Sequence, residues 1–215
     1  MNHPISRADF FDFWRDHLKE PGYTPDLIAK VNALADRLGL AANDNQAAPA
    51  APVRSSSYDR AVMRAELVRD EGERLKVYRC TAGKLTIGVG RNLDDVGIFA
   101  HETAALGITK QSCIASGISE TQSRRLLDSD IDRVEDDLDR QLPWWRKLDP
   151  VRQRVMVNMA FNLGIRGLCG FKNTLGMIQR GDYAGAAANM LLSKWANQVG
   201  KRANRLAVMM RTGAA

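Results

Sequence analysis

The fold of this chain is decided within Arg69–Gly90, where the sequence reads RDEGERLKVYRCTAGKLTIGVG. Two alternating stretches, Leu75–Cys80 and Leu85–Gly90, are separated by the short segment Thr81–Lys84. Alternation of apolar and polar residues predicts strands, and a short connection that contains glycine joins antiparallel strands. We therefore expect a small β-hairpin here, directly after a helix that Gly72 ends.

Outside this hairpin, much of the sequence from Tyr58 to the last residue has a helical pattern. Apolar residues recur three and four positions apart, and helix-capping side chains stand before several of these runs. We expect the segment after Gly90 to be loop-like, with helices from Ser119 onward. The expected features are a helix over about Tyr58–Asp70 capped by the preceding serines, a capping box of Ser119 and Gln122, a helix face of Leu127, Ile131, Val134 and Leu138, helix starts at Asp149–Pro150 and near Asn173 and Asp182, and a last stretch from Trp195 to Met210.

By composition, the chain divides into three segments. Residues 1–40 contain two short helical patterns, one behind Ser6 and one behind Thr24, and two such helices rarely form a core of their own. Residues 41–57 are rich in Ala, Pro, Ser and Asn without an apolar period, which is typical of a linker. Residues 58–215 hold the hairpin and the helices. The expected fold class is α+β: a mostly helical, two-lobed domain with a small β-hairpin lobe, preceded by a short helical segment.

The formal net charge of the 215 residues is +6, and it is unevenly distributed. Residues 1–40 carry −1 and residues 41–57 are neutral, so residues 58–215 carry +7. This favours a polyanionic partner such as nucleic acid, an anionic membrane or a bacterial wall, although solubility alone also explains a basic surface. No recognisable nucleic-acid-binding motif is present.

Several other classes find no support in the sequence. The sequence contains no run of about 18 apolar residues, so it predicts no membrane-spanning helix. The first residues lack the pattern of a signal peptide. The three cysteines, Cys80, Cys113 and Cys169, are odd in number and widely spaced, so they predict no disulfide framework. The three histidines are scattered, and we expect no metal site.

Three residues of the opening stretch have the chemistry of a catalytic site. Glu71 stands where a helix ends and a hairpin begins, and Asp70 and nearby helix carbonyls would disfavour the charged form of its carboxyl. Such a carboxyl can protonate a leaving oxygen. Cys80 and Thr86 flank the hairpin turn, so their side chains can lie close together and hold a water. Each residue also has a structural interpretation: a surface acid, a small buried hydrophobe and an ordinary strand residue.

This stretch resembles the lysozymes of the T-even phages and their relatives, glycoside hydrolase family 24. That family carries a Glu, eight residues, an Asp or Cys, five residues and a Thr, and Glu71, Cys80 and Thr86 have this spacing. The resemblance covers nearly all of residues 58–215 and implies two lobes joined by a long helix. Further matching blocks follow in order: MAFNLG at 159–164, GFKNT at 170–174, WANQ at 195–198 and MRTG at 210–213.

The resemblance also implies roles for single residues. Glu71 would be the general acid that protonates the glycosidic oxygen, and Thr86 would position the attacking water. Cys80 would act with Thr86 on this water, as a thiol or as a thiolate whose pKa nearby Arg or Lys lowers. Phe161, Asn162 and Arg202 would line the substrate cleft, with Arg202 and Arg205 near the acidic entry to the site. Arg91 replaces a usual His, which leaves an Arg91–Asp70 ion pair open.

The implied activity is that of an endolysin, a muramidase that hydrolyses the β-1,4 bond between N-acetylmuramic acid and N-acetylglucosamine in peptidoglycan and lyses the host cell. The corresponding expectations are no cofactor, a monomer held in the host cytoplasm, holin-dependent access to the wall in the periplasm, and contact of the basic surface with an anionic outer envelope. Residues 1–40 would bind the wall or dock on the main domain. Two alternatives stay open: a lytic transglycosylase, and a catalytically weak peptidoglycan-binding protein, against which the retained Glu71 argues.

Overall fold

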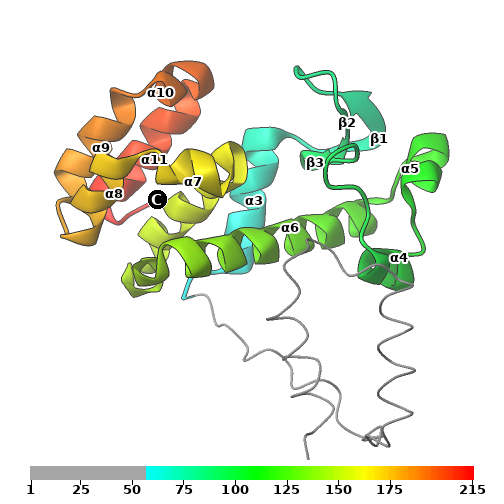
Figure 1. Cartoon of the computed structure of the whole chain (residues 1–215), viewed down its shortest axis with the longest axis horizontal. Helices are drawn as coiled ribbons and strands as arrows, with labels where there is room; N and C mark the ends of the chain where they lie inside the picture. Colours follow the sequence, from blue (N-terminus) through cyan, green and yellow to red (C-terminus); the bar gives the residue numbers. More distant parts are fainter. Residues whose placement is uncertain (1–56) are drawn as a thin grey trace, which may run out of the picture. The chain divides into compact units, whose positions relative to one another are not determined.

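The computed structural model describes residues 57–215, so the expected helices of residues 1–40 and nearly all of the linker lie outside the described residues. In this part of the chain, helices predominate around one small sheet (Figure 1). The elements are α3 (Arg60–Glu71), β1 (Arg74–Arg79), β2 (Leu85–Gly88), β3 (Arg91–Asn92), α4 (Ala100–Leu106), α5 (Lys110–Ser116), α6 (Glu120–Gln141), the 3-10 helix η1 (Pro143–Lys147), α7 (Pro150–Cys169), α8 (Lys172–Gln179), α9 (Tyr183–Leu191), α10 (Lys194–Val199) and α11 (Lys201–Thr212).

The smaller lobe is built on the predicted hairpin. Its sheet has the order β1-β2-β3 with antiparallel pairing throughout, and Tyr78 lies opposite Thr86 in the register. Ile87 from the sheet packs with Cys113 from α5 and Leu126 from α6 in a core of its own. The hairpin therefore does not stand alone, since two helices that follow it in the sequence, α5 and α6, contribute to the core on which it packs.

The larger lobe is helical and has a separate core, formed mainly by α6, α7, α9 and α11. Helix α6 joins the two lobes, because Leu126 belongs to the smaller core and the adjacent Leu127, with Ile131 and Leu138, belongs to the larger one. Figure 1 shows this long helix running beneath both lobes. The expected two-lobed α+β fold is confirmed. No helix among the described residues combines the length and apolarity needed to span a bilayer.

Several helix boundaries agree with the sequence, and others do not. The capping box of Ser119 and Gln122 is confirmed, as is the start of α7 behind Asp149. Helix α3 is capped by Asp59 rather than by the serines, because the Asp59 carboxylate accepts the N–H of Ala61. The predicted loop after Gly90 was wrong, since β3, α4 and α5 lie there.

The last predicted helix is interrupted. Gly200 has φ 52° and ψ −116°, a conformation that suits glycine, and it separates α10 from α11. This break lets Trp195 and Arg202 belong to two helices with different directions. Both residues reach the same site, as described below.

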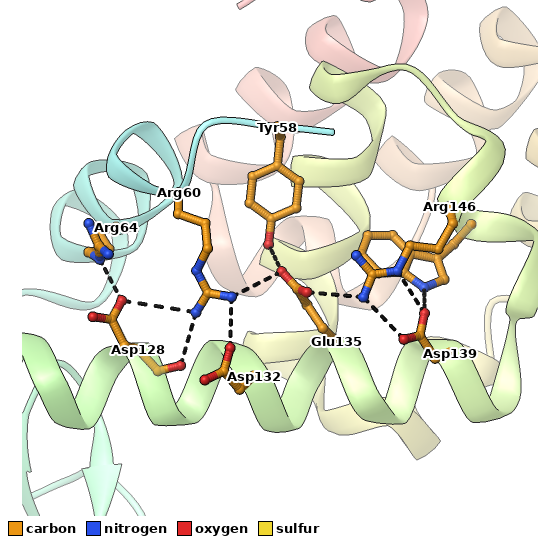
Figure 2. A network of polar contacts seen from close by, with 9 residues as sticks. Tyr58, Arg60, Arg64, Asp128, Asp132, Glu135, Asp139 and Arg146 are labelled. Carbon is orange, nitrogen blue, oxygen red and sulfur yellow. Dashed lines mark hydrogen bonds and ion pairs between the residues drawn. The ribbon is translucent and has the colours of Figure 1, made fainter. Parts of the chain in front are cut away.

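The start of the domain is tied to α6 by a polar network (Figure 2). The Tyr58 hydroxyl donates to Glu135, and both side chains are buried. Arg60 donates to Asp132 at 2.7 Å, and Arg146 from η1 donates to Glu135 at 3.0 Å. Two cationic side chains and a phenol therefore surround the Glu135 carboxylate, which would otherwise be an unpaired buried charge.

Candidate active site

Glu71 is the last residue of α3, and its side chain is 21% exposed. Gly72 ends the helix with φ 74° and turns the chain into β1. Gly90, at the end of the hairpin segment, lies beside this carboxyl: a Cβ at Gly90 would be 3.9 Å from Glu71 Oε2 and 4.0 Å from Phe161 Cε1. The helix end, the sheet and α7 thus meet at Glu71, and Phe161 stands across Gly90 from it.

Arg202 holds the Glu71 carboxylate from α11. Its Nη1 donates to Glu71 Oε1 at 2.6 Å, while its Nε and Nη2 donate to the side-chain and backbone oxygens of Asn158 at 2.8 and 3.2 Å. All three guanidinium nitrogens are therefore engaged within the protein, and the residue is buried. This geometry makes Arg202 a positioning residue for Glu71, and the contact with substrate that the resemblance implies stays a prediction.

Asp70, next to Glu71 in the sequence, is bound by side chains of α7 and α11. Arg205 forms an ion pair with Asp70 Oδ1, and Asn158 Nδ2 donates to Oδ2 at 2.9 Å. Arg202 Nε also lies 3.5 Å from Asp70 Oδ2, so the two adjacent carboxyls share Arg202, and Arg205 pairs with Asp70. The reasoning from local chemistry considered only Asp70 and helix carbonyls as neighbours of Glu71, whereas the family resemblance placed Arg202 and Arg205 near these acids, where the structure has them.

Asn162 links Glu71 to an aromatic side chain of α10. Its Nδ2 lies 3.5 Å from Glu71 Oε1, and its Oδ1 accepts the indole N–H of Trp195 at 2.9 Å. Trp195 is buried, so this hydrogen bond fixes the orientation of the amide and turns its donor end toward Glu71. Of the three residues expected to line the cleft, Phe161 is partly exposed and Asn162 is exposed, whereas Arg202 is buried.

Cys80 and Thr86 are brought together by the hairpin, as the spacing predicted. The Thr86 side chain hydrogen-bonds Cys80, and the partly exposed thiol also accepts backbone N–H groups of the turn. These contacts, from Lys84 first and then Ala82, lower the pKa of the Cys80 thiol below its ordinary value of 9.0. The leading cause is therefore the backbone of the turn and not the charge of a nearby Arg or Lys, which the sequence analysis expected to lower this pKa.

Tyr78 is a residue of this site that the sequence analysis did not select. It lies opposite Thr86 in the β1–β2 register, and the Arg74 guanidinium lies 4.4 Å from its ring centroid. Burial raises the pKa of Tyr78, and the negative charges of Cys80 and Glu71 raise it further against the opposing charge of Arg74. The phenol therefore lies within electrostatic range of both groups. Its position in the stretch that resembles the family is the signal by which the sequence could have indicated it.

Arg91 does not pair with Asp70, so that alternative was wrong. Its Nη2 lies 2.7 Å from Glu102 Oε1 and its Nε lies 2.9 Å from Asp130 Oδ2, in the interior of the smaller lobe. Arg91 is 2% exposed and therefore has a structural role there. Within residues 57–215, no group of three His, Cys, Asp or Glu side chains is arranged to hold a metal ion.

Comparison with known proteins agrees with this geometry. The family model for phage lysozyme matches residues 68–211. Probable T4-type lysozyme 2 of Dictyostelium discoideum is 31% identical over 155 residues, which cover 67% of this chain and 90% of that protein. Probable T4-type lysozyme 1 of the same organism is 27% identical over 153 residues, with the same two coverages.

A third relative is the pre-baseplate central spike protein Gp5 of Enterobacteria phage T4. It is 29% identical over 158 residues, which cover 68% of this chain and 27% of that protein. The segment that the family model matches holds the hairpin, the junction at Glu71 and the two arginines of α11. This chain belongs to the phage lysozyme family and is a glycoside hydrolase of the lysozyme type.

Proposed function

We propose that this lysozyme is an endolysin that cleaves the β-1,4 bond between N-acetylmuramic acid and N-acetylglucosamine in peptidoglycan. The observation that carries the proposal is the junction of α3 and the hairpin. There Glu71 is held by Arg202 at 2.6 Å, while Cys80 and Thr86 are paired across the turn. One positioned acid and one polar pair that can hold a water are the parts needed for a single displacement at the sugar carbon.

In the proposed reaction, Glu71 gives its proton to the glycosidic oxygen, and the bond from that oxygen to the anomeric carbon breaks. A water held by Thr86 and Cys80 attacks the same carbon. The Cys80 thiolate takes a proton from this water, which balances the proton given by Glu71. The lowered pKa of Cys80 supports this role, because more of the thiolate is present at a given pH than for an ordinary cysteine.

Replacement of the acid tests the proposal. Glu71→Gln keeps the shape of the side chain but cannot donate the proton, so clearing of a cell-wall suspension should slow by about 10²–10⁴-fold. Circular dichroism and thermal unfolding of the variant would show whether it is folded. A folded Glu71→Gln protein that clears walls at the wild-type rate would falsify the assignment.

A lytic transglycosylase is the alternative within the same chemistry. It also needs one acid, but the sugar itself closes the ring and no water is used. Mass spectrometry of digested peptidoglycan separates the two, because hydrolysis leaves a reducing N-acetylmuramic acid and transglycosylation leaves its anhydro form. Loss of activity in Thr86→Val would further support a bound water, whereas full activity would count against it.

Release is a further part of the endolysin proposal. The enzyme would accumulate in the host cytoplasm as a monomer and reach the wall in the periplasm through a lesion made by a holin-like partner. Cells that express it should therefore lyse slowly, and rapidly once a membrane-permeabilising agent is added. Complete lysis without such an agent would contradict this route. A single species at monomer mass in light scattering is expected.

Contact with an anionic envelope would involve the basic end of the chain. No Asp or Glu follows Asp182, and Lys194, Lys201 and Arg211 are exposed. Arg202 and Arg205 do not contribute, because they are engaged at Asp70 and Glu71. Binding to cell envelopes should weaken as salt rises, since the screening length falls from about 10 Å at 0.1 M to about 3 Å at 1 M. Binding that is independent of salt would exclude this contact.

A further inference from the structure

Two charged side chains that the proposed mechanism does not use are buried between α3 and α7. Arg154 Nε lies 3.2 Å from each carboxylate oxygen of Glu66, and both side chains are 8% exposed. Met63 and Leu67 of α3 and Val155 of α7, which are close to them in the sequence, belong to one apolar core. The Glu66–Arg154 pair therefore places two charges within the core that α3 and α7 share.

An ion pair in this setting contributes little to the stability of the fold as such. Removal of two charges from water has a large cost, and replacement of a buried pair by apolar side chains of similar size is often neutral or stabilising. Loss of one partner alone is strongly unfavourable, because the other charge is then buried without a counter-charge. The pair therefore favours the one arrangement of α3 on α7 in which the two groups meet, over others that would bury the same apolar surface.

The pair stands at the start of a row of polar contacts that leads along both helices to Glu71. Asp70 follows Glu66 by four residues on α3, which is about one helical turn. Asn158 follows Arg154 by four residues on α7, and its Nδ2 donates to Asp70 at 2.9 Å. The two contacts thus lie one turn apart along each helix, and Glu71 directly follows the second.

The cationic partner of Glu71 is itself held by α7. Arg202 comes from α11, but its Nε and Nη2 donate to the side-chain and backbone oxygens of Asn158 at 2.8 and 3.2 Å. Its Nη1 donates to Glu71 at 2.6 Å. Helix α3 therefore carries the carboxylate and α7 holds the guanidinium, so the distance between the two groups depends on how α3 lies against α7. Glu66 lies about 7.5 Å before Glu71 along α3, so a displacement at the pair reaches the acid.

We propose that Glu66 and Arg154 are positioning residues of the active site, which fix α3 on α7 and so hold the Glu71 carboxylate against Arg202. This inference rests on the proposed function, in which Glu71 is the acid. Both residues are buried and act through Glu71, without contact with the substrate. Without the pair, the helices would pack with Glu71 in a range of positions, and the hold of Arg202 on its carboxylate would weaken.

Replacement of the whole pair separates positioning from stability. Glu66→Leu/Arg154→Met removes both charges and fills their space with apolar side chains, so urea unfolding should show a stability equal to or above that of the wild type. The control is Arg64→Gln/Asp128→Asn, which removes an ion pair that joins the same helix to α6 instead of α7. Release of reducing ends from purified sacculi gives kcat and KM for each protein.

We expect the pair variant to lose about 10- to 100-fold in kcat with KM nearly unchanged, because the bound substrate meets a misplaced acid. The limb of the pH–rate profile on which activity falls with rising pH should move to higher pH. The reason is that a carboxylate farther from Arg202 keeps its proton to a higher pH. The variant leaves the other charged and titratable groups near Glu71 in the chain: Asp70 with Arg205, and Tyr78 and Cys80 of the hairpin.

A wild-type kcat and pH profile in the folded pair variant would overturn the proposal, as would equal changes in the control. If the pair variant does not fold, Glu66→Gln takes its place, since it keeps an acceptor for Arg154 but not the charge. The same shift of the pH limb is then expected, with a smaller loss of kcat. An unchanged limb in Glu66→Gln would refute the positioning role.

A measurement without turnover separates this inference from the proposed hydrolysis. The indole N–H of Trp195 bonds Asn162, whose amide lies beside Glu71, and its NMR signal is one of four from tryptophan. A step in the pH titration of this signal that is absent in Glu71→Gln reports the charge of Glu71. This step should move to higher pH in the pair variant, whatever the rate of cleavage.

The two proposals then fail in different ways. Normal cleavage by Glu71→Gln together with a shifted step in the pair variant would refute the hydrolase assignment and support the positioning role. Loss of cleavage in Glu71→Gln with an unshifted step in the pair variant would refute the positioning role alone.

Discussion

The hairpin places the Cys80 thiol beside the Thr86 side chain, where both groups can contact one water. Its sulfur accepts hydrogen bonds from the backbone of the turn, and these are the main cause of the lowered thiol pKa. A thiolate and a carboxylate are both anions that can take a proton from water. The position therefore accepts either group, provided that the side chain stays in the partly exposed setting that it has here.

Alkylation measures this property directly. The rate of modification of Cys80 by iodoacetamide should rise with a midpoint below pH 9.0, since only the thiolate reacts. Modification should abolish lysis in the wild type, and Cys80→Ser should resist that inactivation whatever its residual rate.

Cys80→Asp provides the complementary test, because it restores a carboxylate at the same place. We expect a folded protein with substantial activity, measured by thermal unfolding and by wall clearing. An unfolded Cys80→Asp protein would show instead that the site cannot accept a charge, and it would remove Cys80 from the mechanism.

At the scale of elements, the smaller lobe depends on how closely α5 approaches β1. Gly117 ends α5 with φ 79° and ψ −159°, and a Cβ there would lie 2.4 Å from the carbonyl oxygen of Leu75. That oxygen accepts the N–H of Ile118 at 2.9 Å. Helix and strand are therefore joined through backbone atoms, and neither can move away without loss of this bond.

Two glycines allow this contact to be tested with a matched control. Gly107 also ends a helix at positive φ, but nothing lies within 4 Å of a Cβ there. Gly107→Ala should cost about 1 kcal/mol of unfolding free energy and Gly117→Ala at least about 3 kcal/mol. Urea unfolding measures both values. Equal costs would mean that backbone strain alone, and not the approach of α5 to β1, requires Gly117.

The buried ion pairs of the same lobe predict a loss of stability in acid. Burial alone would raise the pKa of Glu102, but hydrogen bonds from Arg91, the Phe99 N–H and Ser129 outweigh it and lower this pKa to about 2. In the unfolded chain the pKa returns to its ordinary value of 4.5. The contribution is therefore fully present above about pH 4.5 and is lost as the pH falls toward 2.

The size of this contribution is about 3 kcal/mol, from the difference between the two pKa values. Unfolding free energies of the wild type and Glu102→Gln should differ most near neutral pH and converge as the pH falls toward 2. A difference that stays constant between pH 6 and pH 2 would exclude Glu102 as the titrating group. Glu102→Gln also removes one of the carboxylates that pair with Arg91, and this changes the unfolding free energy at every pH. The test is therefore whether the two unfolding free energies approach each other as the pH falls, and not how far apart they are at one pH.

The sequence predicted the longer elements and missed the shorter ones, for a physical reason. Helix α6 has 22 residues, so its apolar face repeats often enough to be recognised. Helices α4 and α5 have seven residues each and end at Gly107 and Gly117, so neither completes a periodic pattern. The pairing of Cys80 with Thr86 was predictable because a hairpin turn fixes it locally.

Contacts between distant segments could not be predicted in this way. Glu71 and Arg202 are 131 positions apart, and only the packing of α11 against the rest of the larger lobe brings them together. The same holds for Arg91 and Asp130, which are 39 positions apart. The sequence shows which residues are charged, but it does not show which partner each of them has in the folded protein.

At the scale of the whole molecule, the network around Glu135 holds the first described residues against α6. Tyr58 is 4% exposed, and its hydroxyl is one of the donors that the Glu135 carboxylate needs. Tyr58→Phe should lower the unfolding free energy by about 1–3 kcal/mol, because a buried acceptor loses a donor. Denaturant unfolding followed by tryptophan fluorescence measures this change.

Tyr183→Phe is the control for the loss of a phenol oxygen. Tyr183 is partly buried, and its ring lies 3.7 Å from the Arg152 guanidinium, a contact that phenylalanine keeps. We expect a change well below that of Tyr58→Phe. If Tyr58→Phe and Tyr183→Phe had the same unfolding free energy, the hydrogen bond from Tyr58 to Glu135 would not stabilise the fold, and the ion pairs of Arg60 and Arg64 would remain as the polar ties of α3 to α6.

Helix α3 carries this anchor at one end and Glu71 at the other, about 18 Å away along its 12 residues. Mechanical tension on the chain before residue 57 enters the domain at Tyr58 and passes into α6 through Glu135 and Asp132. Such a load is therefore shared between α6 and α3. We expect Glu71, at the other end of α3, to be displaced less than it would be if α3 alone carried the load.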